Sequence, residues 1–186
     1  MRVRSVPFVL ALVFGFIVPV VAQQPQQKEL RKPDIFYLPT PQEAVEAMLK
    51  MAHVTSKDVV YDLGSGDGRI PITAAREYGA RAVGIDIDPK MIKEANKNAQ
   101  EAGVSDKVSF RNEDLFDTDF SEATVITLYL LQSLNEKLRP ILQKLKPGTR
   151  IVSHAFSMGS EWPTEKTEEV QTTDRGTVTI YYWTVK

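Results

Sequence analysis

The sequence predicts an α/β fold in which a mostly parallel sheet carries helices on both faces. Two observations predict it. From about residue 34 onward, short apolar runs rich in β-branched residues alternate with longer segments whose apolar residues recur at helical spacing. In addition, a glycine-rich loop lies directly after one of the short runs and before one of the longer segments. Strands that alternate with helices pair in parallel, because each helix carries the chain back across the sheet.

The helices are marked by apolar residues at helical spacing and by signals at their ends. Pro41 and Pro89 each stand where a first helical turn accepts proline. Gly103 closes one helix, and Lys146-Pro147-Gly148 is a stop signal for another. Helices are therefore expected at residues 41–52, 70–78, 89–102 and 134–145.

The strands are marked by short runs in which valine, isoleucine, threonine and aromatic residues predominate. The first run, Val59-Val60-Tyr61-Asp62-Leu63, leads into the glycine-rich loop. The last run is long and has no helix after it. Strands are expected at residues 59–63, 82–86, 108–111, 124–130, 150–156 and 177–185.

The chain of 186 residues suits one globular domain preceded by a different kind of segment. In residues 1–22, two arginines precede an apolar run that ends with Val20-Val21-Ala22. This order is typical of a secretory signal peptide, and a membrane anchor that is not cleaved is the alternative. Residues 23–33 are polar and predict a flexible linker. The folded domain is expected to span residues 34–186.

The composition excludes several kinds of site. The chain has no cysteine, which excludes a disulfide framework, a thiolate nucleophile and a cysteine-ligated metal. No metal site is expected, because no cluster of acidic ligands stands out in the sequence. The formal net charge of −1 gives no global basic field, so nucleic acid is not an expected partner.

The segment Asp62-Leu63-Gly64-Ser65-Gly66-Asp67-Gly68 predicts a cofactor site at the end of the first strand. Its three glycines let the backbone approach a ligand closely, and the amino end of the next helix can receive a carboxylate. A dinucleotide-binding loop is the alternative, but its pattern needs a glycine where Arg69 stands. The Asp62 carboxylate would crowd a pyrophosphate, whereas it suits the ammonium group of S-adenosyl-L-methionine.

Acidic residues after the second and third strands extend this site. Asp86 ends the second strand, where its carboxylate can accept hydrogen bonds from both ribose hydroxyls. Asp88 is the expected cap of the following helix, which leaves Asp86 available for the ribose. Asp114, after the third strand, is placed to accept from an adenine amino group. Ile87 and Leu115 are expected to flank the adenine ring.

These motifs resemble class I S-adenosylmethionine-dependent methyltransferases, which have a Rossmann-like fold with a mostly parallel seven-stranded sheet. A narrower resemblance lies in Ile35-Phe36-Tyr37-Leu38-Pro39-Thr40-Pro41, in Leu130-Leu131-Gln132-Ser133-Leu134 and in the segment from Lys146 to Ser153. These segments are similar to the small protein-lysine methyltransferases related to the enzymes that modify the adenine nucleotide translocase and the ATP synthase c subunit. The resemblance covers residues 34 to 163 approximately.

The resemblance implies a methyltransferase that uses S-adenosyl-L-methionine and modifies lysine side chains of a protein substrate. Tyr37 and Thr40 would close over the cofactor and help to position the donated methyl group. Tyr129, at the carboxyl end of the fourth strand, is the candidate for lining the acceptor channel. Glu113 is a second candidate for that channel, and His154 is a candidate general base whose alternative role is structural.

Two other functions and three locations stay open. A small-molecule methyltransferase is the enzymatic alternative, and a non-catalytic cofactor-binding module at a membrane is the other. The N-terminal segment predicts export to the periplasm or the exterior, or attachment to a membrane, with the cytosolic face as a further alternative. The sequence makes no prediction of the oligomeric state.

Overall fold

The computed structural model describes residues 30–34 and 37–186, and residues 1–22, the predicted signal peptide or anchor, lie outside that part. Within it, no helix is long and apolar enough to span a membrane. The helices are α1 (Gln42–Met51), α2 (Arg69–Tyr78), α3 (Pro89–Glu101) and α4 (Gln132–Leu142). The strands are β1 (Val59–Leu63), β2 (Arg81–Asp86), β3 (Val108–Asn112), β4 (Val125–Leu128), β5 (Arg150–His154), β6 (Lys166–Thr172) and β7 (Gly176–Thr184).

The strands form one seven-stranded sheet in the order β3-β2-β1-β4-β5-β7-β6. The first five pair in parallel, and β7 runs antiparallel to both β5 and β6. The predicted mostly parallel α/β fold is therefore confirmed. The chain first winds from β1 towards β3 and then crosses back to β4 on the other side of β1. This reversal places a ligand crevice at the carboxyl ends of β1 and β4.

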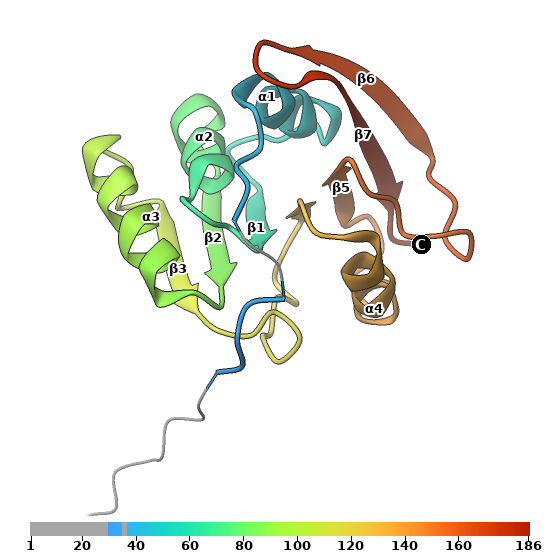
Figure 1. Ribbon diagram of the computed structural model, residues 1–186, viewed down its shortest axis with the longest axis horizontal. Helices are drawn as coiled ribbons and strands as arrows, with labels where there is room; N and C mark the ends of the chain where they lie inside the picture. The colour runs from blue at the N-terminus through green and yellow to red at the C-terminus, as the bar shows by residue number, and fades with distance from the viewer. Residues whose placement is uncertain (1–29, 35–36) are drawn as a thin grey trace, which may run out of the picture.

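Helices cover both faces of the sheet, as Figure 1 shows: α1, α2 and α3 lie on one side and α4 lies on the other. Each face has its own apolar core. One core includes Val45 and Leu49 of α1 with Val152 of β5, and the other includes Leu138 of α4 with Ile126 of β4. Alternate residues of each strand point to opposite faces, so both cores draw on the same strands.

The structure differs from the sequence expectations mainly near β5 and at the sheet edge. β5 ends at His154, two residues earlier than expected, because Ala155 takes a positive φ of 63° that breaks the extended backbone. β4 stops at Leu128, and α4 begins at Gln132, earlier than expected. The strand β6 was not predicted. It is largely exposed, carries several charged residues and pairs with β7 at the edge of the sheet.

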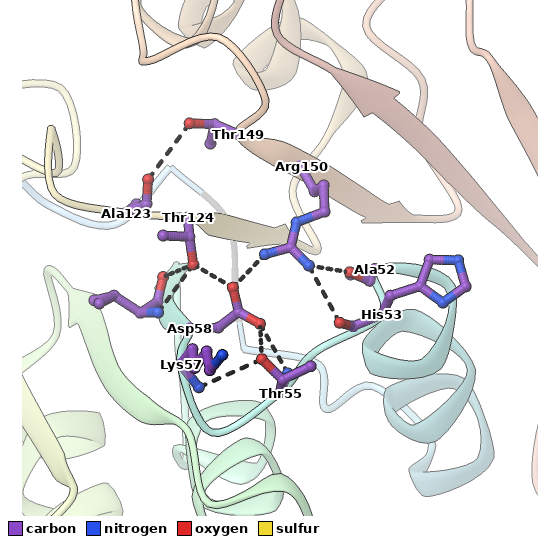
Figure 2. A network of polar contacts seen from close by, with 10 residues as sticks. Ala52, His53, Thr55, Lys57, Asp58, Ala123, Thr124, Thr149 and Arg150 are labelled. Atoms are coloured by element: carbon purple, nitrogen blue, oxygen red, sulfur yellow. Dashed lines mark hydrogen bonds and ion pairs between the residues drawn. The ribbon is translucent and has the colours of Figure 1, made fainter.

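A polar network joins the amino-terminal ends of the strands (Figure 2). The buried Asp58 carboxylate, just before β1, pairs with Arg150 at the start of β5. It also accepts hydrogen bonds from the Thr124 hydroxyl at 2.7 Å and from the Thr55 backbone N–H at 2.8 Å. Arg150 donates in addition to the carbonyl oxygen of Ala52 at 2.6 Å. The network therefore ties the end of α1 to three strands, and none of its buried side-chain polar atoms lacks a hydrogen-bond partner.

Candidate functional site

A cavity of about 840 Å³ opens at the carboxyl ends of β1, β2 and β4. This is the edge of the sheet where the winding direction reverses. Most of the site residues predicted from the sequence line it. They are Tyr37, Thr40, Asp62, Gly64, Ser65, Asp86, Ile87, Leu115 and Tyr129. Gly66, Gly68 and Asp114 lie next to the cavity without lining it.

The glycine loop is held against the end of β2 by its own backbone. The N–H groups of Gly64 and Ser65 donate to the carbonyl oxygen of Ile85 at 2.8 and 2.9 Å. Gly66 has a φ of 51°, and a Cβ built on it would lie 2.2 Å from the Tyr37 ring. Gly68 has a φ of 80° and precedes the first residue of α2. Glycine is therefore required at these positions both by the backbone conformation and by close packing.

Asp62 is a buried carboxylate at the cavity wall. In the register of β1 with β4 it lies beside Thr127, whose hydroxyl donates to it at 2.7 Å. Burial raises the pKa of Asp62 to about 7 against the effect of that hydrogen bond, and the Asp86 and Asp67 charges add to the rise. The nearby Ser65 hydroxyl is buried and has no hydrogen-bond partner in the described part of the chain. Both groups suit a polar, cationic ligand group.

Asp86 is fixed in orientation by two backbone groups. Its carboxylate accepts from the N–H of Gly66 at 2.8 Å and from the N–H of Asp88 at 2.9 Å. Burial raises the pKa of Asp86, opposed by these hydrogen bonds. A carboxylate has about four acceptor positions, so capacity for two further donors remains. The Asp88 side chain accepts from the Lys90 N–H and caps α3, as the sequence predicted.

The segment before α1 is fastened to the glycine loop by Arg69. Its guanidinium makes several bonds to Asp67, one of them 2.7 Å long, and also donates to the carbonyl oxygen of Thr40 at 2.8 Å. The Tyr37 ring lies on Gly66. Burial raises the pKa of Tyr37, and the neighbouring Asp67 charge raises it further, so its hydroxyl stays protonated at neutral pH. Tyr37 and Thr40 thus form one side of the cavity.

Aromatic side chains from the segments that follow β4 and β5 form another part of the cavity wall. Tyr129 and Phe156 line the cavity and stack with a centroid separation of 6.4 Å. His154 packs on Tyr129 at 3.9 Å, and its Nδ1 lies 3.4 Å from the Thr40 hydroxyl. His154 is 1% exposed and does not line the cavity. Burial, together with the charge of Arg175, lowers its pKa to about 4, so the imidazole is neutral at pH 7, and its position outside the cavity indicates a packing role.

The adenine-side residues have a partner that the sequence did not reveal. Ile87 and Leu115 line the cavity as expected. The Asp114 carboxylate, however, is bound by Arg31, which belongs to the predicted linker. Arg31 itself lines the cavity. No local pattern pointed to Arg31, because its partner lies 83 residues away.

Further cavity residues that were absent from the sequence-based candidates are Pro33, Asp34, Leu38, Met91, Leu131 and Leu134. Glu113, which was a candidate for the acceptor channel, also lines the cavity and accepts from the Thr118 hydroxyl at 2.9 Å. Groups of histidine, aspartate and glutamate able to hold a metal ion are absent from residues 30–34 and 37–186.

Comparison with known proteins identifies relatives of this arrangement. Residues 62–166 match the ANTKMT methyltransferase domain. The chain is 47% identical over 135 residues to a protein-lysine N-methyltransferase of Saccharolobus islandicus, a match that covers 72% of this chain and 84% of that protein. It is 30% identical over 141 residues to the mouse lysine N-methyltransferase that is named for the ATP synthase c subunit. That match covers 75% of this chain but only 56% of the mouse protein.

A solved structure is also similar. The crystal structure described as an RNA methyltransferase from Salinibacter ruber, in complex with S-adenosyl-L-homocysteine, superposes with a TM-score of 0.75 at 56% sequence identity. The match covers 80% of this chain and 94% of that chain. The names of these relatives thus agree on methyl transfer and differ in the acceptor, and the Salinibacter structure contains S-adenosyl-L-homocysteine.

Proposed function

This chain belongs to the ANTKMT methyltransferase domain family and is an S-adenosylmethionine-dependent methyltransferase, and we propose that its acceptor is the lysine side chain of a protein. The observation that carries the proposal is the character of the cavity, which combines an acidic wall with an apolar, partly exposed rim.

The charged residues of the cavity wall are mainly acidic. They are Asp34, Asp62, Asp67, Asp86, Asp88 and Glu113, against Arg31 and Arg69. Both arginines are paired with acidic side chains, Arg31 with Asp34 and Asp114 and Arg69 with Asp67. The field inside the cavity therefore favours cations, and both the sulfonium cofactor and an alkylamine acceptor carry positive charge.

The rim of the cavity is apolar and accessible. Among the described residues, the exposed large apolar side chains are Tyr37, Leu38 and Leu131, which are 41%, 46% and 44% exposed. All three line the cavity. Apolar side chains gathered around an opening are typical of a surface that binds another protein. They also suit the methylene chain of a lysine, which is apolar up to its terminal amine.

The residues of the wall fit S-adenosyl-L-methionine along its length. Asp62 and the unpaired Ser65 hydroxyl suit the ammonium and carboxylate groups of its methionine part. Asp86 suits the two ribose hydroxyls, and Ile87 and Leu115 suit the faces of the adenine ring. The Asp114 carboxylate, which was predicted to bind the adenine amino group, is held by Arg31. Gly64, Gly66 and Gly68 let the loop backbone approach the ligand, and Tyr37 and Thr40 cover it.

The reaction needs alignment and a neutral amine. The cofactor supplies a methyl group bonded to a positively charged sulfur. The acceptor nitrogen forms the new bond to the methyl carbon, the carbon–sulfur bond breaks, and its electron pair stays on sulfur, which leaves S-adenosyl-L-homocysteine. Tyr129, Phe156 and Tyr37 exclude water around the amine, which disfavours its charged form and promotes loss of a proton to solvent before attack. The product is a methylated ammonium, which then loses one proton to solvent to give the neutral methylated amine.

RNA is a second candidate acceptor, because the Salinibacter protein is described as an RNA methyltransferase. The charge of this chain argues against it. Its formal net charge is −1, and the cavity wall is acidic, so phosphate groups would be repelled at the opening. The segment after β4, Tyr129-Leu130-Leu131, also lacks the Asn/Asp-Pro-Pro-Tyr/Phe signature used to present the exocyclic amine of a base.

The experiment that separates the acceptors is methyl labelling. The full chain is incubated with S-adenosyl-L-methionine labelled in its methyl group and with a cell extract, and portions are then treated with RNase or with proteinase. Label is expected in material that resists RNase and is lost to proteinase, and hydrolysis is expected to yield methylated lysine. A matched extract whose lysines were blocked beforehand by reductive methylation should take up little label.

Other outcomes refute the lysine proposal. Label lost to RNase would identify RNA as the acceptor, and label only in small molecules would indicate a small-molecule methyltransferase. A protein that binds the cofactor but labels nothing would be a cofactor-binding module. The Asp86→Ala variant serves as the control for labelling that does not depend on the enzyme.

We also propose that residues 1–22 direct the protein to a membrane, either as a signal peptide for export or as an anchor. The support is the order of two arginines, an apolar run and small residues. Cell fractionation combined with protease accessibility and N-terminal sequencing tests this. A full-length chain recovered only in the soluble cytosol would refute both alternatives.

A further inference from the structure

The short segment of residues 31–34, which we call the 31–34 strap, lies against the adenosine side of the cavity. Arg31, Pro33 and Asp34 line the cavity, together with Ile87 and Leu115 from the ends of β2 and β3. The sequence assigned residues up to 33 to a flexible linker. Their place in the cavity wall gives them direct contact with whatever occupies the adenosine side.

Arg31 holds the strap in place through contacts with three side chains. Its guanidinium pairs with Asp114, with one hydrogen bond of 3.1 Å from Nη2 and a shorter one from Nε. It also pairs with Asp34 within the strap. Its Cζ lies 5.4 Å from the centroid of the Phe116 ring. Two bonds to one carboxylate and contact with a ring hold the planar guanidinium in a single orientation.

The guanidinium lies between Asp114 and the cavity. Arg31 lines the cavity, whereas Asp114 does not. The Asp114 side chain is 11% exposed and that of Arg31 is 35% exposed. Burial alone would raise the pKa of Asp114, but its hydrogen bonds from Arg31 and from the Phe116 backbone lower it, so it stays ionised. An ion pair of this kind is shielded from solvent on the Asp114 side and accessible on the Arg31 side.

We propose that Arg31 is a positioning residue that keeps the 31–34 strap on Asp114 over the adenosine side of the cofactor and thereby sets how long the cofactor stays bound. The cofactor leaves when the Arg31–Asp114 pair breaks and the strap moves away. Breaking this pair therefore speeds dissociation of both S-adenosyl-L-methionine and S-adenosyl-L-homocysteine. The inference depends on the cofactor and not on which acceptor the enzyme uses.

The test measures dissociation of the cofactor from the full chain. Labelled S-adenosyl-L-homocysteine is bound to the protein and then chased with excess unlabelled ligand. The Arg31→Ala variant is expected to release it roughly fivefold faster, with an association rate that changes less than twofold, in line with the modest strength of partly exposed ion pairs. The dissociation rate of Arg31→Lys should lie between those of the wild type and Arg31→Ala, because an ammonium cannot bind a carboxylate through two parallel bonds.

A double-mutant cycle tests whether Arg31 and Asp114 affect cofactor dissociation through their ion pair or independently of each other. If Arg31 acts through Asp114, the Arg31→Ala change should have little further effect in an Asp114→Ala background. A steady-state measurement gives a second readout. The KM for S-adenosyl-L-methionine should rise in Arg31→Ala, while the KM for the acceptor stays within twofold of the wild-type value.

The matched control is Arg81→Ala. Arg81 forms a similar pair with Glu122, at 2.7 Å, at the opposite end of the sheet from the cavity. This variant should release the ligand at the wild-type rate. The proposal is overturned if Arg31→Ala releases the ligand at the wild-type rate or more slowly, if Arg81→Ala speeds release equally, or if the effects of Arg31→Ala and Asp114→Ala are additive.

Discussion

Buried or partly buried carboxylates lie at both ends of the sheet, but they differ in the number of hydrogen-bond donors around them. Asp58, at the amino-terminal ends of the strands, has many donors, whereas Asp62 and Asp86, at the carboxyl ends, have few. Asp58 receives two hydroxyls, a backbone N–H and the Arg150 guanidinium (Figure 2). Asp62 receives one hydroxyl, from Thr127, and Asp86 receives two backbone N–H groups. No cation pairs with either of them in the described part of the chain. One end is arranged for the stability of the fold and the other leaves acceptor capacity for a ligand.

The pKa values of these carboxylates shift in opposite directions. At Asp58, burial raises the pKa, but the bonds from Thr124, Thr55 and Arg150 outweigh it and lower the pKa. That contribution to stability is present above the unfolded-state pKa and is lost as the pH falls through the folded-state pKa. At Asp62 the pKa rises to about 7. Its contribution is present at acid pH below the unfolded-state pKa and is lost as the pH rises towards 7.

The largest effect is expected from breaking the Asp58–Arg150 pair. In Arg150→Ala the Asp58 carboxylate, whose side chain is 8% exposed, loses its cation, and we expect the free energy of unfolding to fall by about 3 kcal/mol. Chemical denaturation measures this change. The cofactor dissociation constant should stay within twofold, and Arg81→Ala, in a pair exposed to solvent, should cost less than about 1 kcal/mol. If Arg150→Ala lost cofactor affinity but no stability, the amino-terminal ends of the strands would not be the part of the sheet that serves stability alone.

The next effect concerns Asp86. Removing its carboxylate removes the proposed acceptor of both ribose hydroxyls, and charged hydrogen bonds of this kind predict a loss of affinity of roughly a hundredfold in Asp86→Ala. Isothermal titration calorimetry with S-adenosyl-L-homocysteine measures it. Glu122→Ala, which removes a carboxylate at the other end of the sheet, should bind as the wild type does. An Asp86→Ala variant of unchanged affinity would exclude Asp86 from the cofactor site.

The smallest effect is a pH dependence caused by Asp62. With a pKa of about 7, this carboxylate is ionised at pH 7.5 but largely protonated at pH 6. Because an ionised carboxylate binds the ammonium group, affinity for S-adenosyl-L-methionine should fall roughly tenfold over that range. His154, with a pKa of about 4, stays neutral throughout. The Asp62→Asn variant should bind S-adenosyl-L-methionine more weakly, and its affinity should not depend on pH in this range. If the affinity of this variant showed the same pH dependence, the titrating group would be another residue.

Much of the fold could be predicted because the signals are local. Pro89 after Asp88, for example, marks the first turn of α3, and the cap that this predicts is present. β6 was missed because its charged residues, such as Glu168 and Glu169, suit an exposed edge strand, which is defined by its pairing with β7 rather than by an apolar pattern of its own. The early end of β5 was missed because Ala155 has a positive φ, a conformation that alanine rarely adopts and that its residue type does not predict.

The site was predictable to the extent that strand ends determine it. Asp62 and Asp86 lie near the carboxyl ends of neighbouring parallel strands, so their proximity follows from the topology. The contacts of Arg31 and Arg69 could not be predicted, since a guanidinium reaches partners that are distant in the sequence. The roles of the predicted residues in binding stay predictions until the variants are measured.

The place of β7 affects how the protein folds during synthesis. β7 is the last strand in the chain, yet it lies between β5 and β6. Its residue Ile180 belongs to the core on one face and its residue Trp183 to the core on the other, and both are fully buried. Neither core is complete until β7 has left the ribosome, so a nascent chain that ends before it exposes apolar surface on both faces, which favours aggregation.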